Sequence, residues 1–218
     1  NFAATAYLNR WKVKIYYEHY FDDHSQMFFQ YGRWKDGHIG LEITFPKNRF
    51  IDTFVYEGLG TKDQTGPMLY DSFWGEFEEQ ISAKDNYYNH YLYQGWQHWG
   101  MGIGNPLLPG PIYNKNGQIT FISNRVLAHH IGFCGSPCQS LSYRMLLSYS
   151  RHWGTYDNPL NEIKKQFNSL FEVTYAPQQL KGWSFTVSGA MDRGNLLGNN
   201  YGGMLVIRKQ GIIKSGNK

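Results

Sequence analysis

A period-two alternation of apolar and polar residues constrains the fold more than any other feature. In residues 11–18 the odd positions are Trp, Val, Ile and Tyr, and the even positions are Lys, Lys, Tyr and Glu. Residues 39–45, 143–150, 171–175 and 183–192 repeat the pattern. Because successive side chains of a β-strand point to opposite faces, each segment predicts a strand with one apolar face. Strands are expected to begin near residues 7, 26, 38, 50, 87, 119, 141, 169, 183 and 203.

Composition supports an all-β chain with one domain over its 218 residues. Aromatic residues and charged residues each make up 17% of the chain, and glycine is abundant. This mixture excludes a disordered chain, which needs high charge and few aromatic residues, and disfavours a helical bundle. The stretch 86–114 carries no Asp, Glu, Lys or Arg, but Gly and Pro interrupt it, so it predicts no membrane helix.

The two faces of the expected strands favour a membrane barrel over a soluble β-sandwich. Aromatic residues stand at the ends of the apolar faces, as at Trp11 and Tyr17, which is typical of the interfacial girdles around a lipid-facing band. A sandwich core also accepts alternating apolar faces, but its aromatic residues need no girdle. The polar faces carry Arg, Glu, Lys, Ser and Thr in mid-strand, as a water-filled lumen permits. We therefore predict an antiparallel transmembrane β-barrel. Near the C-terminus, the lipid-facing set would be Trp183, Phe185, Val187 and Met191, and the polar interior set Ser184, Thr186 and Ser188.

The expected connections differ in length. Residues 35–37, 46–48 and 177–182 read as short turns, whereas residues 58–86, 95–117 and 154–168 read as long connections. Short helical turns are expected at 73–82 and 160–168. Since the order does not alternate cleanly between the two rims, either a strand lies within 58–86 or one long segment folds into the lumen.

The sequence offers no pattern for catalysis, metal binding or nucleic-acid binding. The net charge of +4 is spread along the chain, which disfavours nucleic acid as a partner. The histidines lack ligand spacing, so no metal site is expected. Asp71 and the glutamates at 76, 78 and 79 are the kind of carboxylates that a glycoside hydrolase uses, but such clusters are usually a solvated surface.

Two cysteines, Cys134 and Cys138, flank the sequence Gly-Ser-Pro. Gly and Pro favour a turn that would bring the two sulfur atoms within disulfide range. Two free thiols are the alternative, and would be typical of a reducing compartment. We expect a disulfide across a hairpin loop.

Residues 85–113 are rich in aromatic and amide side chains. Aromatic faces can stack on sugar rings while amides bond sugar hydroxyls, a common division of labour at polar ligand sites. The alternative is a packed loop with structural aromatic residues. The expected carbohydrate-binding residues are Asn86, Tyr87, Tyr88, Asn89, Trp96 and Trp99.

Several short motifs resemble those of the Wzi-type capsule-assembly outer-membrane proteins, and their order and spacing carry the resemblance. The motifs are Val55-Tyr56-Glu57, Thr61 to Pro67, Asp85 to His90, Ile103 to Leu107, Asn124-Arg125-Val126, Trp153 to Tyr156, Gly198-Asn199-Asn200 and Gly202 to Arg208.

The resemblance implies a β-barrel in the outer membrane of a Gram-negative bacterium that holds capsular polysaccharide without catalysis or cofactor. Because members of the family are longer, residues 1–218 are expected to form one β-barrel domain, the C-terminal part of a larger barrel that lacks the N-terminal strands. The implied partners are surface polysaccharide, outer-membrane lipid and lipopolysaccharide, and the remainder of the same barrel. A diffusion porin and a carbohydrate-active hydrolase are the alternative functions.

Overall fold

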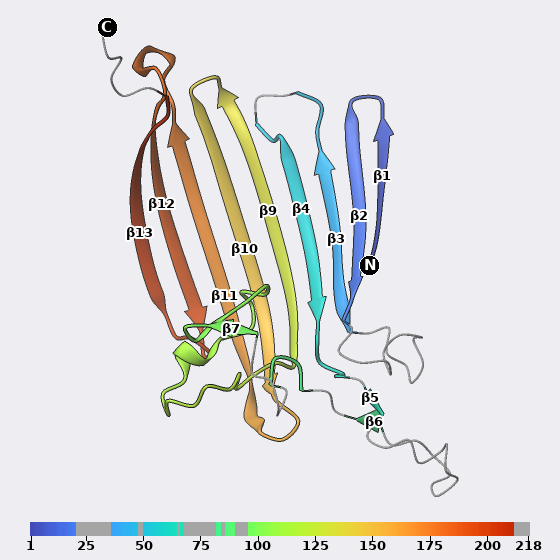
Figure 1. Cartoon of the computed structure of the whole chain (residues 1–218). Coiled ribbons are helices and arrows are strands. Elements are labelled where there is room, and N and C mark those ends of the chain that lie inside the picture. The colour runs from blue at the N-terminus through green and yellow to red at the C-terminus, as the bar shows by residue number, and fades with distance from the viewer. Residues whose placement is uncertain are drawn as a thin grey trace, which may run out of the picture.

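The computed structural model describes residues 1–20, 36–47, 50–64, 66–67, 82–83, 86–89 and 96–211. These residues form an antiparallel sheet of nine strands in the order β1-β2-β3-β4-β9-β10-β11-β12-β13 (Figure 1). Its strands are β1 (Phe2–Leu8), β2 (Trp11–His19), β3 (Gly37–Thr44), β4 (Thr53–Gly60), β9 (Val126–Cys138), β10 (Leu141–Gly154), β11 (Pro159–Tyr175), β12 (Trp183–Gly194) and β13 (Asn200–Lys209).

Smaller elements lie in the connections. Two short strand pairs, β5 (Gly66–Pro67) with β6 (Ser82–Ala83) and β7 (Gln97–His98) with β8 (Met101–Gly102), precede a 3₁₀ turn, η3 (Pro111–Tyr113). A second 3₁₀ turn, η4 (Gln178–Leu180), joins β11 to β12. In the described part of the chain, no helix is long and apolar enough to cross a membrane.

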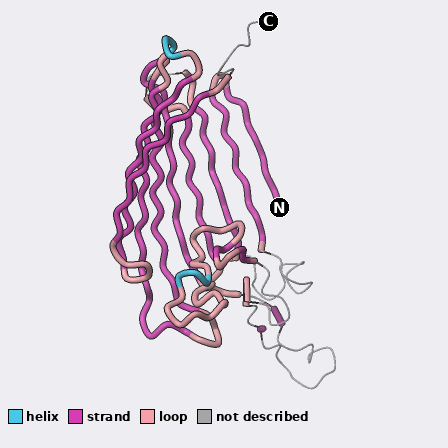
Figure 2. The backbone as a smooth tube through the Cα atoms, turned by 60° about the vertical axis from the view of Figure 1, so that its left-hand side comes forward, coloured by secondary structure: helices cyan, strands magenta, loops and turns pink. Residues whose placement is uncertain are grey.

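The sheet consists of two meanders, β1–β4 and β9–β13, which the pairing of β4 with β9 joins edge to edge. The turns at residues 9–10, 139–140 and 176–182 lie on one rim, at the top of Figure 1. The described residues of the connection from β4 to β9, which comprises residues 61–125, lie at the opposite rim, which we call the loop rim. Figure 2 shows the strands as a single curved layer with the described loops gathered at its ends.

Each face of the sheet has its own chemistry. One face exposes large apolar side chains, for example Ile39 at 52% and Val187 at 61% exposure. The opposite face is mainly polar, and Ser188 on it is buried. The predicted alternation in residues 183–188 is therefore confirmed. No second sheet or helix of the described residues covers the apolar face.

The described sheet has two free edges. β1 pairs with β2 alone, and β13 pairs with β12 alone. The prediction of an all-β chain with antiparallel strands is confirmed, and the described residues do not close into a barrel by themselves.

Two predicted strands are wrong, and one long strand was predicted as a loop. Tyr87 lies in a turn, and the strand expected near residue 119 begins instead at Val126. Residues 160–168, predicted as a helical turn within a long connection, belong to β11. Their apolar residues have helical spacing, but pairing with β10, as between Gln166 and Ser150, determines the structure. The strand expected near residue 26 and the turn at 73–82 lie outside the described residues.

The predicted disulfide between Cys134 and Cys138 is wrong, since both thiols are free. Both residues lie in β9, and four residues of an extended strand span roughly 13 Å. That length is about twice the Cα separation a disulfide accepts. The hairpin turn falls a few residues later, at residues 139–140. Pro137 is tolerated within β9 because it stands at a register shift of the β9–β10 ladder, where a missing N–H is accepted.

A glycine allows one side chain to reach across a whole strand. Tyr16 on β2 is opposite Gly40 on β3, and Gly40 is opposite Glu57 on β4. The Tyr16 ring lies over Gly40, where a Cβ atom would fall 1.9 Å from the ring Cζ atom. This allows the Tyr16 hydroxyl to donate a hydrogen bond to Oε1 of Glu57.

Replacing Gly40 by Ala should therefore displace the Tyr16 ring and break its bond to Glu57. Loss of a hydrogen bond to a charged group lowers the free energy of unfolding by about 1–3 kcal/mol. Denaturant titration of Gly40→Ala measures this, with Gly189→Ala as a control because no atom lies near its Cβ position. In a Tyr16→Ala background the Gly40→Ala change should become nearly neutral, and an undiminished effect there would contradict the explanation.

Candidate functional site

A cavity of about 870 Å³ lies at the loop rim, between the polar face of the sheet and the segment 96–113. Its floor includes a row of five side chains, one from each of five adjacent strands, namely Glu57, His130, Ser148, Asn168 and Asp192. Its roof comes from the loop side, namely Tyr20, Tyr88, Trp96, Ile103, Asn105, Leu107, Pro109 and Tyr113. The volume falls within the range of about 300–1,000 Å³ that is common for ligand pockets.

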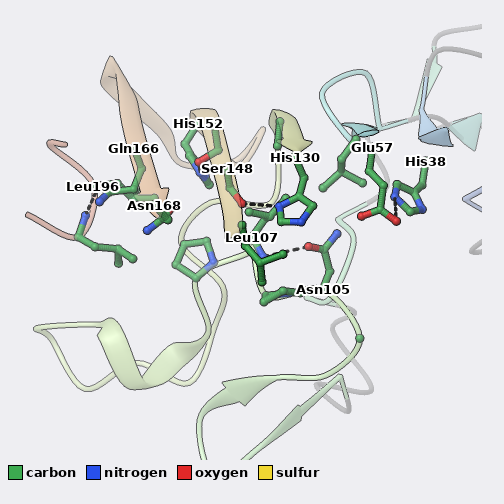
Figure 3. Close-up of a pocket in the computed structure, with 18 of the residues that line it drawn as sticks. His38, Glu57, Asn105, Leu107, His130, Ser148, His152, Gln166, Asn168 and Leu196 are labelled. Carbon is green, nitrogen blue, oxygen red and sulfur yellow. Dashed lines mark hydrogen bonds and ion pairs between the residues drawn. The ribbon is translucent and has the colours of Figure 1, made fainter. Parts of the chain in front are cut away.

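Strand register creates the floor. Glu57 is opposite His130, His130 is opposite Ser148, Ser148 is opposite Asn168, and Asn168 is opposite Asp192. Residues directly opposite one another across a ladder share a face, so these five side chains form one row across the sheet. Figure 3 shows the row from Asn168 to Glu57 lying opposite the loop that carries Leu107. We call these five residues the polar row.

Hydrogen bonds hold neighbours in the polar row. Nδ1 of His130 lies 2.7 Å from Oγ of Ser148. The side-chain amide of Asn168 donates to Oδ1 of Asp192 over 2.7 Å. Because each contact joins side chains on adjacent strands, the floor is fixed before any ligand arrives.

A histidine lies between two carboxylates at the β2 end of the floor. Nε2 of His38 lies 3.5 Å from Oε1 of Glu57, and Nδ1 of His38 lies 3.6 Å from Oε2 of Glu18. The imidazole therefore separates the two acids. All three side chains line the cavity.

The roof combines an aromatic wall with an ordered turn. The Tyr88 ring packs 5.0 Å from that of Phe121 and 6.1 Å from that of Trp96, measured between ring centroids. Oδ1 of Asn105 accepts the Leu107 N–H over 3.0 Å, which turns Leu107 toward the floor.

The turn is also tied to the end of β2. The amide of Asn105 donates to the Tyr20 hydroxyl over 3.4 Å. Burial raises the pKa of Tyr20 to about 12, so this hydroxyl stays neutral at physiological pH and can accept that bond.

The loop is joined to the strands just beyond the β4–β9 pairing. The Thr61 N–H donates to the Val126 carbonyl over 2.9 Å, and the Val126 N–H donates to Oγ1 of Thr61 over 3.0 Å. The Thr61 hydroxyl donates to the Asn124 carbonyl over 2.6 Å. The side chain of Asn124 extends these hydrogen bonds to the loop, because its amide donates to Oδ1 of Asn86 and to the carbonyl of Tyr87. One continuous hydrogen-bond network therefore joins the two ends of the loop.

Three of the predicted sugar-binding residues belong to that network. Oδ1 of Asn86 accepts the bond from Asn124, and Asn89 makes two hydrogen bonds to the backbone of Phe121. Tyr87 is only 7% exposed, and its hydroxyl donates to Asp36. Their polar groups therefore stabilise the loop from within.

Of the other three predicted residues, two reach the cavity. Tyr88 and Trp96 line it, and Trp96 is 51% exposed. Trp99 is 85% exposed, has a positive φ of 53°, and lies outside the residues named in the lining. The structure thus brings Tyr88 and Trp96 together and separates Trp99 from them.

The polar row was missed by sequence reasoning. Each of its members occupies a polar-face position of an alternating strand, which the sequence does indicate. What joins them is the register of four successive strand pairs, and a shift of one residue would move any of them to the other face. The sequence did contain a signal for three of these residues. Ser148, Asn168 and Asp192 stand at even positions of segments whose odd positions are mainly apolar, which places them on the polar face.

Asp36 is the centre of a second buried cluster, outside the cavity. Its carboxylate accepts the backbone N–H groups of Asp63 and Gln64 and the hydroxyl of Tyr87, over 3.0, 2.6 and 3.1 Å. Burial raises the pKa of Asp36 above its ordinary value, and the three donors oppose this shift without cancelling it. Asp36 therefore joins the start of β3 to both parts of the loop.

Asn in place of Asp36 should destabilise the loop, because an amide NH₂ would face at least one N–H donor. The free energy of unfolding should fall by about 1–3 kcal/mol. Since the pKa is raised, ionisation of Asp36 lowers the stability of the wild type as pH rises from the ordinary carboxyl pKa through the raised value. Asp36→Asn should remove that part of the pH dependence, as measured by denaturation across the acid range.

The control is Asp157→Asn, which changes an exposed carboxylate that accepts a bond from Asn86 over 3.4 Å. Equal effects of the two substitutions on stability would contradict the role assigned to Asp36.

The described residues contain no group of three or more His, Cys, Asp or Glu side chains that could hold a metal ion. No protein-family model matches this chain, and neither a curated protein nor a solved structure does so.

Proposed function

We propose that this chain is part of a β-barrel in the outer membrane of a Gram-negative bacterium. We further propose that it binds and anchors capsular or other surface polysaccharide at its loop rim, without cleaving it. The single observation that carries the proposal is the combination of an uncovered apolar face with a polar opposite face whose cavity has an aromatic roof.

The apolar face supports the membrane part of the proposal. Side chains such as Ile15, Phe171 and Val187 are about half exposed or more, and no described element packs on them. Soluble proteins rarely leave so continuous an apolar surface open to water. Lipid chains, including those of lipopolysaccharide, cover such a face in a membrane barrel, while the polar face lines the interior.

The two free edges support the proposal of a larger barrel. The outward N–H and C=O groups of β1 and β13 would have no partner in lipid, which is energetically prohibitive. Strands from the remainder of the same barrel would supply the missing pairing.

The cavity supports polysaccharide as the ligand. The rings of Tyr88 and Trp96 offer flat apolar surfaces, and Ser148 and Asn168 offer a hydroxyl and an amide across from them. Sugars present an apolar ring face and many hydroxyls, so this pairing of surfaces suits them. Weak binding at one site would gain strength through repetition along a polymer.

The spacing of the acids argues for binding rather than cleavage. Glycoside hydrolases hold two carboxylates about 5–9.5 Å apart across one bond. Glu57 and Asp192 are four strand spacings apart, roughly 19 Å. Glu18 and Glu57 are closer, but the His38 ring lies between them.

A single charge on the apolar face tests the membrane proposal. Arg in place of Val187 should destabilise the folded protein in lipid vesicles by about 2–4 kcal/mol, because a charge would face the hydrocarbon. Arg in place of Ala190, which is exposed on the polar face of the same strand, should change stability by about 1 kcal/mol or less. Denaturant titration in vesicles measures both, and an equal response at the two positions would contradict a lipid-facing side.

Removing one ring tests the binding proposal. Trp96→Ala should weaken binding of surface polysaccharide about tenfold, because it removes a stacking face of the cavity. Retention of polysaccharide on cells measures this, once resistance to heat and detergent shows that the variant is folded. Trp99→Ala is the matched control outside the cavity. A loss confined to Trp99→Ala would move the contact to the outer surface of the loop and contradict binding in the cavity.

A further inference from the structure

We infer that the cavity selects neutral or amino-bearing saccharide segments and rejects segments that carry carboxylates. This inference rests on the proposed function, since it names the ligand class of the same cavity. It follows from the distribution of charge over the polar face.

The charged residues that line the cavity are acidic. They are Glu18, Glu57 and Asp192, and no Lys or Arg is present among the described lining residues. The floor also contains His38, His130 and His152. The lining therefore carries negative charge before a ligand binds.

Most basic residues of the polar face lie toward the other rim. Lys164 is the exception, since it lies opposite His152 at the loop rim, but its Nζ atom lies 2.6 Å from Oε1 of Glu162. Nζ of Lys12 lies 3.5 Å from Oε1 of Glu42, and a guanidinium nitrogen of Arg144 lies 3.2 Å from Oε1 of Glu172. Lys12 and Arg144 stand near the turns at residues 9–10 and 139–140, at the far end of their strands from the cavity. They do not neutralise its floor by direct contact.

Apolar walls strengthen this negative field. Leu59, Leu107, Pro109 and Ala128 line the same space, and Leu59 and Ala128 are buried. A charged cleft with low-dielectric walls concentrates its field, so a ligand ammonium is attracted and a ligand carboxylate is repelled. Neutral sugars are neither attracted nor repelled by this field, and they can still stack on the aromatic roof.

Two of the three acids mark the ends of the polar row. Glu57 lies at the β4 end of the polar row and Asp192 at the β12 end, roughly 19 Å apart by strand spacing. Glu57 contacts Tyr16 and His38, and Glu18 contacts His38, whereas the hydrogen bond described for the Asp192 carboxylate comes from the neutral amide of Asn168. Asp192 is therefore the lining acid without a described histidine contact, and its charge is available to a ligand ammonium. Several linked sugar rings would span its distance from Glu57.

The test compares three oligosaccharides of equal length on the full-length protein purified in detergent. The probes are chitosan oligosaccharide, which carries ammonium groups, chitin oligosaccharide, which is neutral, and oligogalacturonate, which carries carboxylates. Calorimetric titration should rank their affinities in that order.

Asp192→Asn should weaken binding of the chitosan probe about fivefold and leave binding of the chitin probe unchanged. This substitution preserves a hydrogen-bonding partner for Asn168 and so should fold. Glu172→Gln is the matched control, because it removes an acid from the same face outside the cavity.

The outcomes distinguish a failure of charge selection from a failure of saccharide binding. Equal or tighter binding of oligogalacturonate would overturn the charge selection while leaving saccharide binding intact. An equal loss of chitosan binding in Asp192→Asn and Glu172→Gln would also overturn it, because the effect would then be one of net charge. Failure of all three probes to bind would overturn the saccharide-binding proposal itself.

Discussion

Strand register is the constraint on which the rest of this structure depends. Side chains alternate between the two faces of each strand. Every pair of neighbouring strands must therefore adopt the register that places polar residues opposite polar residues, so that they gather on one face. The pairing of Glu57 with His130 sets this register between the first meander and the second. Three further ladders extend the same register from His130 to Asp192. A slip at the junction would place apolar side chains beside the loop and polar ones on the outer face.

The junction also determines where the loop lies. Thr61 and Asn124 continue the contact between β4 and β9 beyond the last paired residues, which fixes both ends of the connection close together. The described segment 96–113 lies over the polar face, and Leu108 and Phe121 belong to one core cluster with Leu59, Val126 and Ala128 of the strands. The cavity is the space left between that segment and the polar row. Fold and site are thus two results of one set of backbone pairings.

The sequence predicts the strands better than it predicts the site. Alternation located β2, β3, β10 and β12 because these strands have one apolar face, and side-chain polarity alone records that fact. It failed for residues 160–168, where helical spacing of apolar residues competes with a ladder that only the tertiary structure supplies. It also failed for the cysteines, where the turn moved by a few residues. Amide and aromatic density identified the loop of the site, but could not distinguish Asn86 and Asn89, which hold the loop, from Trp96, which lines the cavity.

The division into two meanders has a consequence for how the chain folds. Within β1–β4 and within β9–β13 each strand pairs with its neighbour in sequence, so the entropy lost on closing each connection is smallest where the turn is short, as at residues 9–10 and 139–140. The β4–β9 ladder instead closes residues 61–125 in one step, and its contacts are far apart along the chain. Such long-range closure is intrinsically slow. The two meanders are therefore expected to form early and separately, and their docking at β4 and β9 to limit the folding rate.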